Sequence, residues 1–137
     1  MELVVHPGTL VICSLPPDSP WPAEPAGSDR AGDGAGYFSV TRTPTELSLV
    51  CRPGAVPPGA VVEPGWRALV VGGALDFGLV GILAGLSGTL AAAGVSIFVL
   101  STFATDTVLV NEVDLDRAVA ALTADGHTVT APTDGRS

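Results

Sequence analysis

The chain has 137 residues, 47% of them hydrophobic and only 15% charged, with fourteen acidic residues against six arginines and no lysine. This length suits one compact body or two very small ones. A formal net charge of −8 without any cluster of basic residues argues against a nucleic acid partner, because a phosphate backbone is bound by lysine and arginine.

The first half of the chain predicts β-strands without regular helices. A strand is expected at residues 8–15, with residues 3–5 as a separate edge strand, and residues 37–42 and 46–52 form a hairpin. Proline forbids a regular helix, and it recurs after each strand region, at Pro16, Pro17, Pro20, Pro22, Pro25, Pro53, Pro57, Pro58 and Pro64. The first run through Gly36 is therefore a loop with Trp21 as its anchor, and the second leaves room for at most one helical turn.

The second half predicts alternating strands and helices. Strands are expected at residues 66–72, 95–100, 107–111 and 127–130. A helix from about Phe77 to Ala93 carries a leucine face and ends at Gly94, and Asp114 caps a second helix that Gly126 ends. The order β-α-β-β-α-β is that of the ferredoxin-like unit.

The two halves also resemble each other in sequence. Residues 38–50 lie over residues 98–110 without a gap, sixty positions apart, so that Glu46 corresponds to Asp106. A period of this length indicates one supersecondary unit used twice. We therefore predict an α+β fold of tandem ferredoxin-like units, with a degenerate first copy at residues 1–64, a complete copy at 65–132 and a tail at 133–137.

The apolar run from Ala68 to Leu100 is long enough to cross a membrane, and its only ionisable side chain is Asp76. Glycines divide the run into strand, helix and strand, and no basic cluster flanks it, so a buried helix between two strands is expected. Cys13 and Cys51 end apolar runs without a CxxC pair or a secretory signal, which predicts buried, reduced thiols in a cytoplasmic protein.

Four motifs occur along the chain in order and at consistent spacing. They are Phe38 to Cys51, Gly65-Trp66-Arg67, Leu75-Asp76-Phe77 and Ser101 to Val110. Together they resemble tandem ACT-domain proteins of the short bacterial type, related to the ACT domains of the CASTOR arginine sensors. The resemblance covers nearly the whole chain and implies a regulatory protein that binds a small molecule, most often an amino acid, by pairing domains.

The resemblance also implies where that ligand lies. It places the site at a domain interface, on the loop at residues 72–81, completed by the turn after Ser101 and by a strand edge of the partnering domain. The residues carried over are Asp76, Phe77, Gly78, Leu79, Val80, Gly81, Ser96, Ile97, Thr102, Phe103 and Asp106. The arginine sensors carry an acidic residue where this chain has Leu79, which removes one partner for a guanidinium group.

The residue types fit a zwitterionic ligand. Free N–H groups at the start of the Phe77 helix suit a carboxylate, Asp106 suits an ammonium group, and Phe77 with Phe103 suits an aliphatic side chain. Each assignment has a structural alternative, because Asp76 is also a good N-cap and aspartate is common in turns.

No nucleophile–base set, phosphate-binding loop or paired histidine–carboxylate arrangement is present in the sequence. We therefore expect no enzyme, no metal and no cofactor. Two functions remain open. One is an amino-acid-binding regulatory protein that acts as a homodimer on an unidentified protein, and the other is a ligand-free module for protein–protein interaction or dimerisation.

Overall fold

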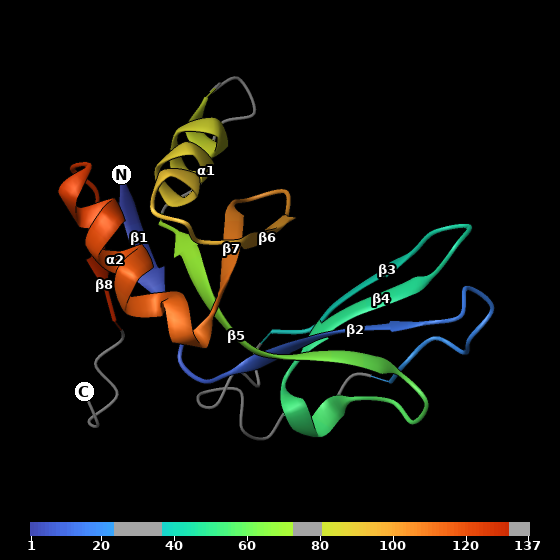
Figure 1. Cartoon of the computed structure of the whole chain (residues 1–137). Helices are drawn as coiled ribbons and strands as arrows, with labels where there is room; N and C mark the ends of the chain where they lie inside the picture. The colour runs from blue at the N-terminus through green and yellow to red at the C-terminus, as the bar shows by residue number, and fades with distance from the viewer. Residues whose placement is uncertain (24–36, 73–80, 132–137) are drawn as a thin grey trace. The chain divides into compact units, whose positions relative to one another are not determined.

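The computed structural model describes residues 1–23, 37–72 and 81–131 (Figure 1). The chain divides into two compact units, one formed by Pro7–Trp66 and the other by Met1–His6 together with Arg67–Ser137. The first six residues therefore belong to the unit that is otherwise built from the C-terminal half. The strand β5 (Val61–Val71) contributes residues to both units.

The Pro7–Trp66 unit is an antiparallel sheet with the strand order β3-β4-β2-β5. Its strands are β2 (Leu10–Leu15), β3 (Ser39–Arg42), β4 (Leu47–Cys51) and the first residues of β5. Between β4 and β5 the chain forms only the short 3-10 turn η2 (Pro53–Ala55), and residues 16–23 after β2 contain no helix. Over the described residues, the ferredoxin-like strands without regular α-helices are as predicted.

Pro64 and Gly65 interrupt the regular pairing of β5. Leu10 pairs with Trp66 but Ile12 pairs with Glu63, so one extra residue is accommodated on the β5 side. Gly65 has φ +80°, a backbone conformation that glycine adopts without steric cost. A proline and a glycine at such a β-bulge bend the strand where regular pairing stops.

Arg42 holds the proline-rich segment that follows β2. Its guanidinium donates hydrogen bonds to the carbonyl oxygens of Pro17 and, at 2.9 Å, of Ser19. The same group lies over the Trp21 ring, 5.7 Å from the ring centroid. Trp21 itself is 60% exposed, so it helps to hold the segment through this contact with Arg42 and not by burial in the core.

The described residues of the second unit form two helices and five strand segments. They are β1 (Glu2–Val5), the end of β5, α1 (Ile82–Ala92), β6 (Ile97–Ser101), β7 (Asp106–Asn111), the 3-10 turn η3 (Glu112–Asp114), α2 (Leu115–Ala124) and β8 (Thr128–Thr130). The strand order is β8-β1-β5-β7-β6. With α1 and α2, these strands give the ferredoxin-like α+β fold that the sequence predicts, plus one additional strand.

The additional strand is β1, which lies between β5 and β8 (Figure 1). It runs antiparallel to β5, with Leu3 opposite Val71, and parallel to β8, with Leu3 opposite Val129. The prediction of an edge strand at residues 3–5 is therefore wrong. Because β1 occupies the place beside β5, the C-terminal strand pairs with β1 instead.

Both helices pack on one face of this sheet. Alternate residues of β1, β5 and β7 share a core with α1 and α2, formed by Leu3, Val5, Leu69, Val71, Leu86, Leu90, Val95, Val108, Val110, Ala118 and Leu122. This period of two along each strand is the expected signature of a sheet with one buried face.

Glycines set the helix ends. Gly94 and Gly126 have φ +75° and +95°, and each ends its helix as predicted, because glycine tolerates this left-handed conformation. Gly81 also has a positive φ, +82°, and α1 begins only after it, at Ile82, later than the expected start near Phe77. Asp114 precedes α2 but makes no side-chain capping bond, so the prediction that it caps this helix is wrong. Its carboxylate accepts a bond from Arg117 at 2.7 Å.

The sixty-residue offset between the halves is wrong by one in the hairpins. Arg42 pairs with Leu47 and Ser101 pairs with Asp106, and each pair closes a four-residue turn. This register makes Glu46 the equivalent of Thr105, not of Asp106. A shift of one residue moves every side chain of a strand to the other face. The sequence similarity between residues 38–50 and 98–110 therefore did not give the correct correspondence between the two hairpins.

In the described ranges, no helix combines the length and the apolar run needed to cross a bilayer. The helix α1 has 11 residues, whereas a spanning helix needs about 20. The run from Ala68 to Leu100 therefore contributes strand, helix and strand to the fold, as expected.

Cys13 and Cys51 are free and buried on neighbouring strands of the first unit, as expected. Burial raises the pKa of both thiols, and burial together with the neighbouring Cys13 raises the pKa of Cys51 to about 12. Removing a thiol from water disfavours its charged form, which explains the direction.

Replacing Leu3 by alanine should lower the free energy of unfolding by about 2–4 kcal/mol, because a fully buried leucine leaves a cavity. Leu3 is 1% exposed, whereas the neighbouring Val4 is 37% exposed. Val4→Ala on the other face of β1 is the matched control and should cost less than about 1 kcal/mol. Urea unfolding measures both, and equal losses would contradict the observed facing of β1.

The Cys51 thiol should make the protein less stable as pH rises above its ordinary pKa of 9.0. From there up to about 12, the unfolded chain loses the proton while the folded chain keeps it, so the free energy of unfolding falls with pH. Urea unfolding of the wild type and Cys51→Ala, from about pH 8 to about pH 10.5, checks this. The stability difference between them should change with pH, and a constant difference would contradict the raised pKa.

Candidate functional site

The β6–β7 hairpin ends in a tight turn from Thr102 to Thr105. The Thr102 amide donates to the Thr105 carbonyl at 2.9 Å, and the Thr105 amide donates to the Thr102 hydroxyl at 3.3 Å. A threonine side chain that bonds the backbone in this way stabilises a turn. The turn presents Phe103 to solvent, with its side chain 85% exposed.

Asp106 is the first residue of β7 and lies opposite Ser101. The Ser101 hydroxyl donates to Asp106 Oδ1 at 2.6 Å. Within the described ranges Oδ2 of Asp106 has no hydrogen-bond partner, although a carboxylate accepts several bonds. Asp106 is thus oriented by the hairpin and keeps one oxygen available for a donor.

Thr105 ties this turn to the end of β5. Its hydroxyl donates to the Val71 carbonyl at 2.6 Å, and the bond is partly buried. The next residue, Gly72, donates its amide to the Glu2 carbonyl at 2.7 Å. A Cβ at Gly72 would lie only 3.2 Å from that oxygen, so glycine permits the close approach. The turn and the start of the loop at residues 72–81 are therefore held side by side.

The structure brings only part of the predicted site together. Thr102, Phe103 and Asp106 share the hairpin end, whereas Asp76, Phe77, Gly78, Leu79 and Val80 lie outside the described residues. Gly81 is exposed at the start of α1.

Ser96 is exposed and Ile97 is half-buried, and both lie at the opposite end of β6 from the turn. Four strand residues span about 13 Å. Within one unit, this pair is therefore separated from the hairpin turn by the length of β6.

Sequence reasoning missed the roles of Thr105 and Ser101. The other unit repeats the arrangement, because the Thr43 amide donates to the Glu46 carbonyl at 2.9 Å and the Ser14 hydroxyl donates to Glu46 Oε1 at 2.9 Å. In both units the last turn residue is thus bonded to the central strand. At an offset of 59 in place of sixty, Thr43 corresponds to Thr102 and Glu46 to Thr105, which is the sequence signal that relates the two turns.

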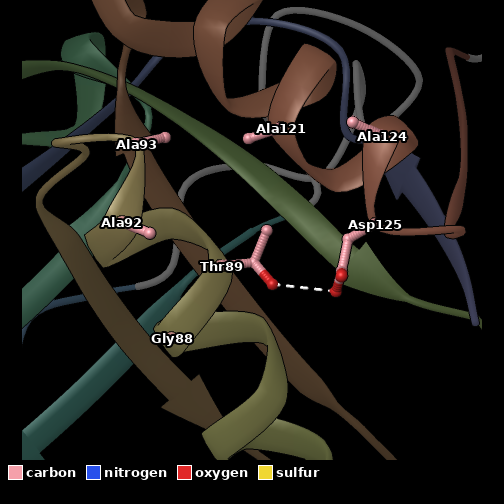
Figure 2. A pocket seen from close by; sticks show the side chains of 7 residues that line it. All are labelled: Gly88, Thr89, Ala92, Ala93, Ala121, Ala124 and Asp125. Carbon is pink, nitrogen blue, oxygen red and sulfur yellow. Dashed lines mark hydrogen bonds between the residues drawn. The ribbon is translucent and has the colours of Figure 1, made fainter.

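A second feature, which the sequence did not predict, is an open hollow between α1 and α2 (Figure 2). Its volume is about 550 Å³, and it is lined by Gly88, Thr89, Ala92, Ala93, Ala121, Ala124 and Asp125. The Thr89 hydroxyl donates to Asp125 Oδ2 at 2.9 Å, and His127 Nε2 lies 3.4 Å from the same oxygen. We call this feature the α1–α2 groove.

The side chains available in the described part of the chain offer carboxylates and hydroxyls but no metal centre. No three of its histidine, cysteine, aspartate and glutamate residues are grouped so as to hold a metal ion. The arrangement at the hairpin can accept hydrogen bonds from a cationic or amino group through Asp106.

Thr105→Val removes the hydroxyl bond to Val71 and keeps the shape of the side chain. The loss of a partly buried hydrogen bond should lower the free energy of unfolding by about 1 kcal/mol. Thr128→Val, an exposed threonine of β8, is the matched control and should change stability little. Chemical denaturation measures both variants, and an unchanged Thr105→Val would contradict a stabilising link between the turn and β5.

Comparisons with known proteins bear on these features. The ACT domain family matches residues 61–124. No curated protein matches the chain. The crystal structure of protein Atu0741 from Agrobacterium tumefaciens is 32% identical, with a TM-score of 0.82 over 96% of this chain and 92% of that one.

More distant structures share the fold. Protein VC0802 from Vibrio cholerae, a protein of unknown function described as a possible transport protein, is 20% identical over 90% of this chain and 88% of its own, with a TM-score of 0.63. The ligand-free regulatory subunit of aspartate kinase from Thermus thermophilus is 10% identical over 89% of this chain and 94% of its own, with a TM-score of 0.59. The chain therefore contains an ACT domain and belongs to the same protein family as Atu0741.

Proposed function

We propose that this chain is a regulatory protein that binds an amino acid at a domain or subunit interface. The observation that carries the proposal is the hairpin end, where Asp106 keeps a free carboxylate oxygen and Thr105 holds the turn against the start of the loop at residues 72–81. The fold shared with a regulatory subunit of aspartate kinase supports it. As part of the same proposal, the chain is a tandem ACT protein related to the CASTOR sensors, with one copy at residues 1–64 and the other at residues 65–132.

The ligand's ammonium group binds Asp106, because a charge-assisted bond to a carboxylate is among the stronger polar contacts available. Its carboxylate is bound by backbone N–H groups of residues 76–81, and Phe77 and Phe103 line its side chain. Thr102 frames the turn.

Ser96 and Ile97 contribute from the partnering domain, which is consistent with their distance from the turn within one unit. A homodimer in the cytoplasm would complete the site in this way. Ligand binding then favours one packing of the two domains and changes access for a regulated protein.

The alternative function is a ligand-free module for protein–protein interaction. It is favoured by the 85% exposure of Phe103 and by the α1–α2 groove, whose lining is small and uncharged apart from Asp125. The two functions differ in one measurable property, the stability of the folded chain in the presence of a free amino acid. Only the first function predicts that a free amino acid raises it.

A thermal-shift screen against the twenty amino acids separates them. We expect a dose-dependent rise in Tm for one or a few amino acids, since a ligand that binds only the folded state stabilises it. Asp106→Asn should abolish the rise, because it removes the charge that binds the ammonium group. Asp116→Asn, an exposed carboxylate on α2, is the matched control and should leave the rise intact.

A flat response of the folded wild type at millimolar ligand would overturn the amino-acid proposal and favour the interaction module. A rise that survives in Asp106→Asn would place the ammonium contact elsewhere. Binding by isothermal titration calorimetry should confirm any hit with one ligand per chain or per dimer.

A further inference from the structure

The described part of each unit places an outer strand, its hairpin partner and a central strand in the same order. These strands are β3, β4 and β2 in the first unit and β6, β7 and β5 in the second. The Ser14 hydroxyl near the end of β2 donates to Glu46 in the turn of its hairpin. The Thr105 hydroxyl in the other turn donates to Val71 at the end of β5. Residues 16–23, which follow β2, therefore correspond to the segment after β5, where the proposed function places the ligand.

Arg42 and Ser101 occupy equivalent positions, each just before the four-residue turn of its hairpin. Their side chains differ in reach. The Arg42 guanidinium crosses to the segment after β2 and donates to the carbonyl oxygens of Pro17 and, at 2.9 Å, of Ser19. The Ser101 hydroxyl lies one bond beyond Cβ and donates to Asp106, directly opposite, at 2.6 Å. This hairpin position therefore supplies a cationic group to the neighbouring segment in the first unit alone.

The contacts of Arg42 are those of a bound guanidinium ion. Its Nη1 and Nη2 atoms donate to two separate carbonyl oxygens, which uses the planar fork that distinguishes a guanidinium from an ammonium group. The Trp21 ring lies against the same group, with its centroid 5.7 Å from the guanidinium carbon, and the negative face of the ring attracts the cation. Among the described residues no carboxylate forms an ion pair with Arg42. We call the two carbonyl groups of Pro17 and Ser19, together with the Trp21 ring, the guanidinium cage.

Proline preorganises the guanidinium cage. The Ser19 amide donates to the Pro16 carbonyl at 3.1 Å and closes a turn, and prolines lie in and beside this turn at Pro16, Pro17 and Pro20. Each proline ring fixes the φ angle of its residue, so less conformational entropy is lost when the cage binds a cation. The cage should therefore keep its shape when the Arg42 side chain is removed.

We propose that the guanidinium cage is a binding site for a guanidinium group and that Arg42 occupies it as an internal ligand. The first unit is thereby closed to free ligand at the place that corresponds to the candidate site of the second unit. The chain then responds to a free ligand through its second unit alone, with one ligand for each chain. The comparison between the units rests on the proposed function, whereas the occupancy of the cage rests on contacts within the first unit.

Thermal unfolding of the full-length chain tests the internal ligand with Arg42→Ser, which gives the first hairpin the shorter side chain found at position 101. We expect Tm to fall by about 3–5 °C, because charge-assisted bonds to two carbonyl oxygens and the contact with Trp21 are lost. Arg52→Ser, at an arginine of the same unit outside the cage, is the matched control and should shift Tm by less than about 2 °C.

Chemical rescue tests whether the emptied cage is a binding site. Ethylguanidinium chloride at about 50 mM should raise Tm of Arg42→Ser by about 1–2 °C, as expected for a ligand near its dissociation constant. It should not raise Tm of the wild type or of Arg52→Ser. Ethylammonium chloride at the same concentration is the matched probe and should cause no rise, because it lacks the planar fork. Trp21→Ala in the Arg42→Ser background should abolish the rescue.

An unchanged Tm in Arg42→Ser, or a fall that ethylguanidinium does not partly reverse, would overturn the internal ligand. An equal response to ethylammonium would also overturn it, because the cage would then show no preference for guanidinium. Calorimetric titration of the wild type with an amino acid that raises its Tm should give one ligand per chain at most. Two ligands per chain would refute the closed first unit and leave the proposed function standing. Rescue as expected, with no response to any amino acid, would refute the proposed function alone.

Discussion

The pairing of β1 between β5 and β8 is the constraint on which the helical unit depends. Residues from the beginning of the chain complete a sheet that is otherwise made by its last half. Leu3 and Val5 enter the same core as Leu86 and Leu122, so β1 contributes backbone hydrogen bonds on both sides and apolar side chains on one. Because β8 pairs with β1 and not with β5, removing the strand would leave both neighbours with unpaired backbone groups. The ACT domain match at residues 61–124 does not include this strand.

The same strand also fixes the start of the candidate site. The Glu2 carbonyl accepts the Gly72 amide, and one residue earlier the Val71 carbonyl accepts the Thr105 hydroxyl. These two hydrogen bonds fix the point at which the chain leaves β5, and they hold the β6–β7 turn beside the end of that strand. Asp106 is held beside this junction by its bond from Ser101 and by the turn. The equivalent junction in the other unit joins the Ser14 hydroxyl to Glu46 Oε1.

The helix α1 combines one buried side with uncharged positions all round. The chain concentrates its acids outside α1 and gives that helix only apolar, hydroxyl and glycine positions. Burial of Leu86 and Leu90 stabilises the unit, whereas Gly85 and Gly88 lower helix propensity without any contact that needs them. Within the described residues, the surroundings of both glycines are open.

The sequence by itself determined the strand and helix types, the loss of helices in the first half, the glycine helix ends and the buried thiols. These features depend on local rules, because proline excludes helix, glycine adopts positive φ and apolar periodicity follows the element. Sequence also indicated the hairpin end as a candidate site. Only the tertiary structure decided that β1 lies inside the sheet, that Thr105 and not Asp106 is the equivalent of Glu46, and that Arg42 holds the proline-rich segment. Those outcomes depend on which strands pair and in which register. Pairing is stabilised by contacts between residues far apart in the sequence, and such contacts leave no local pattern in the chain.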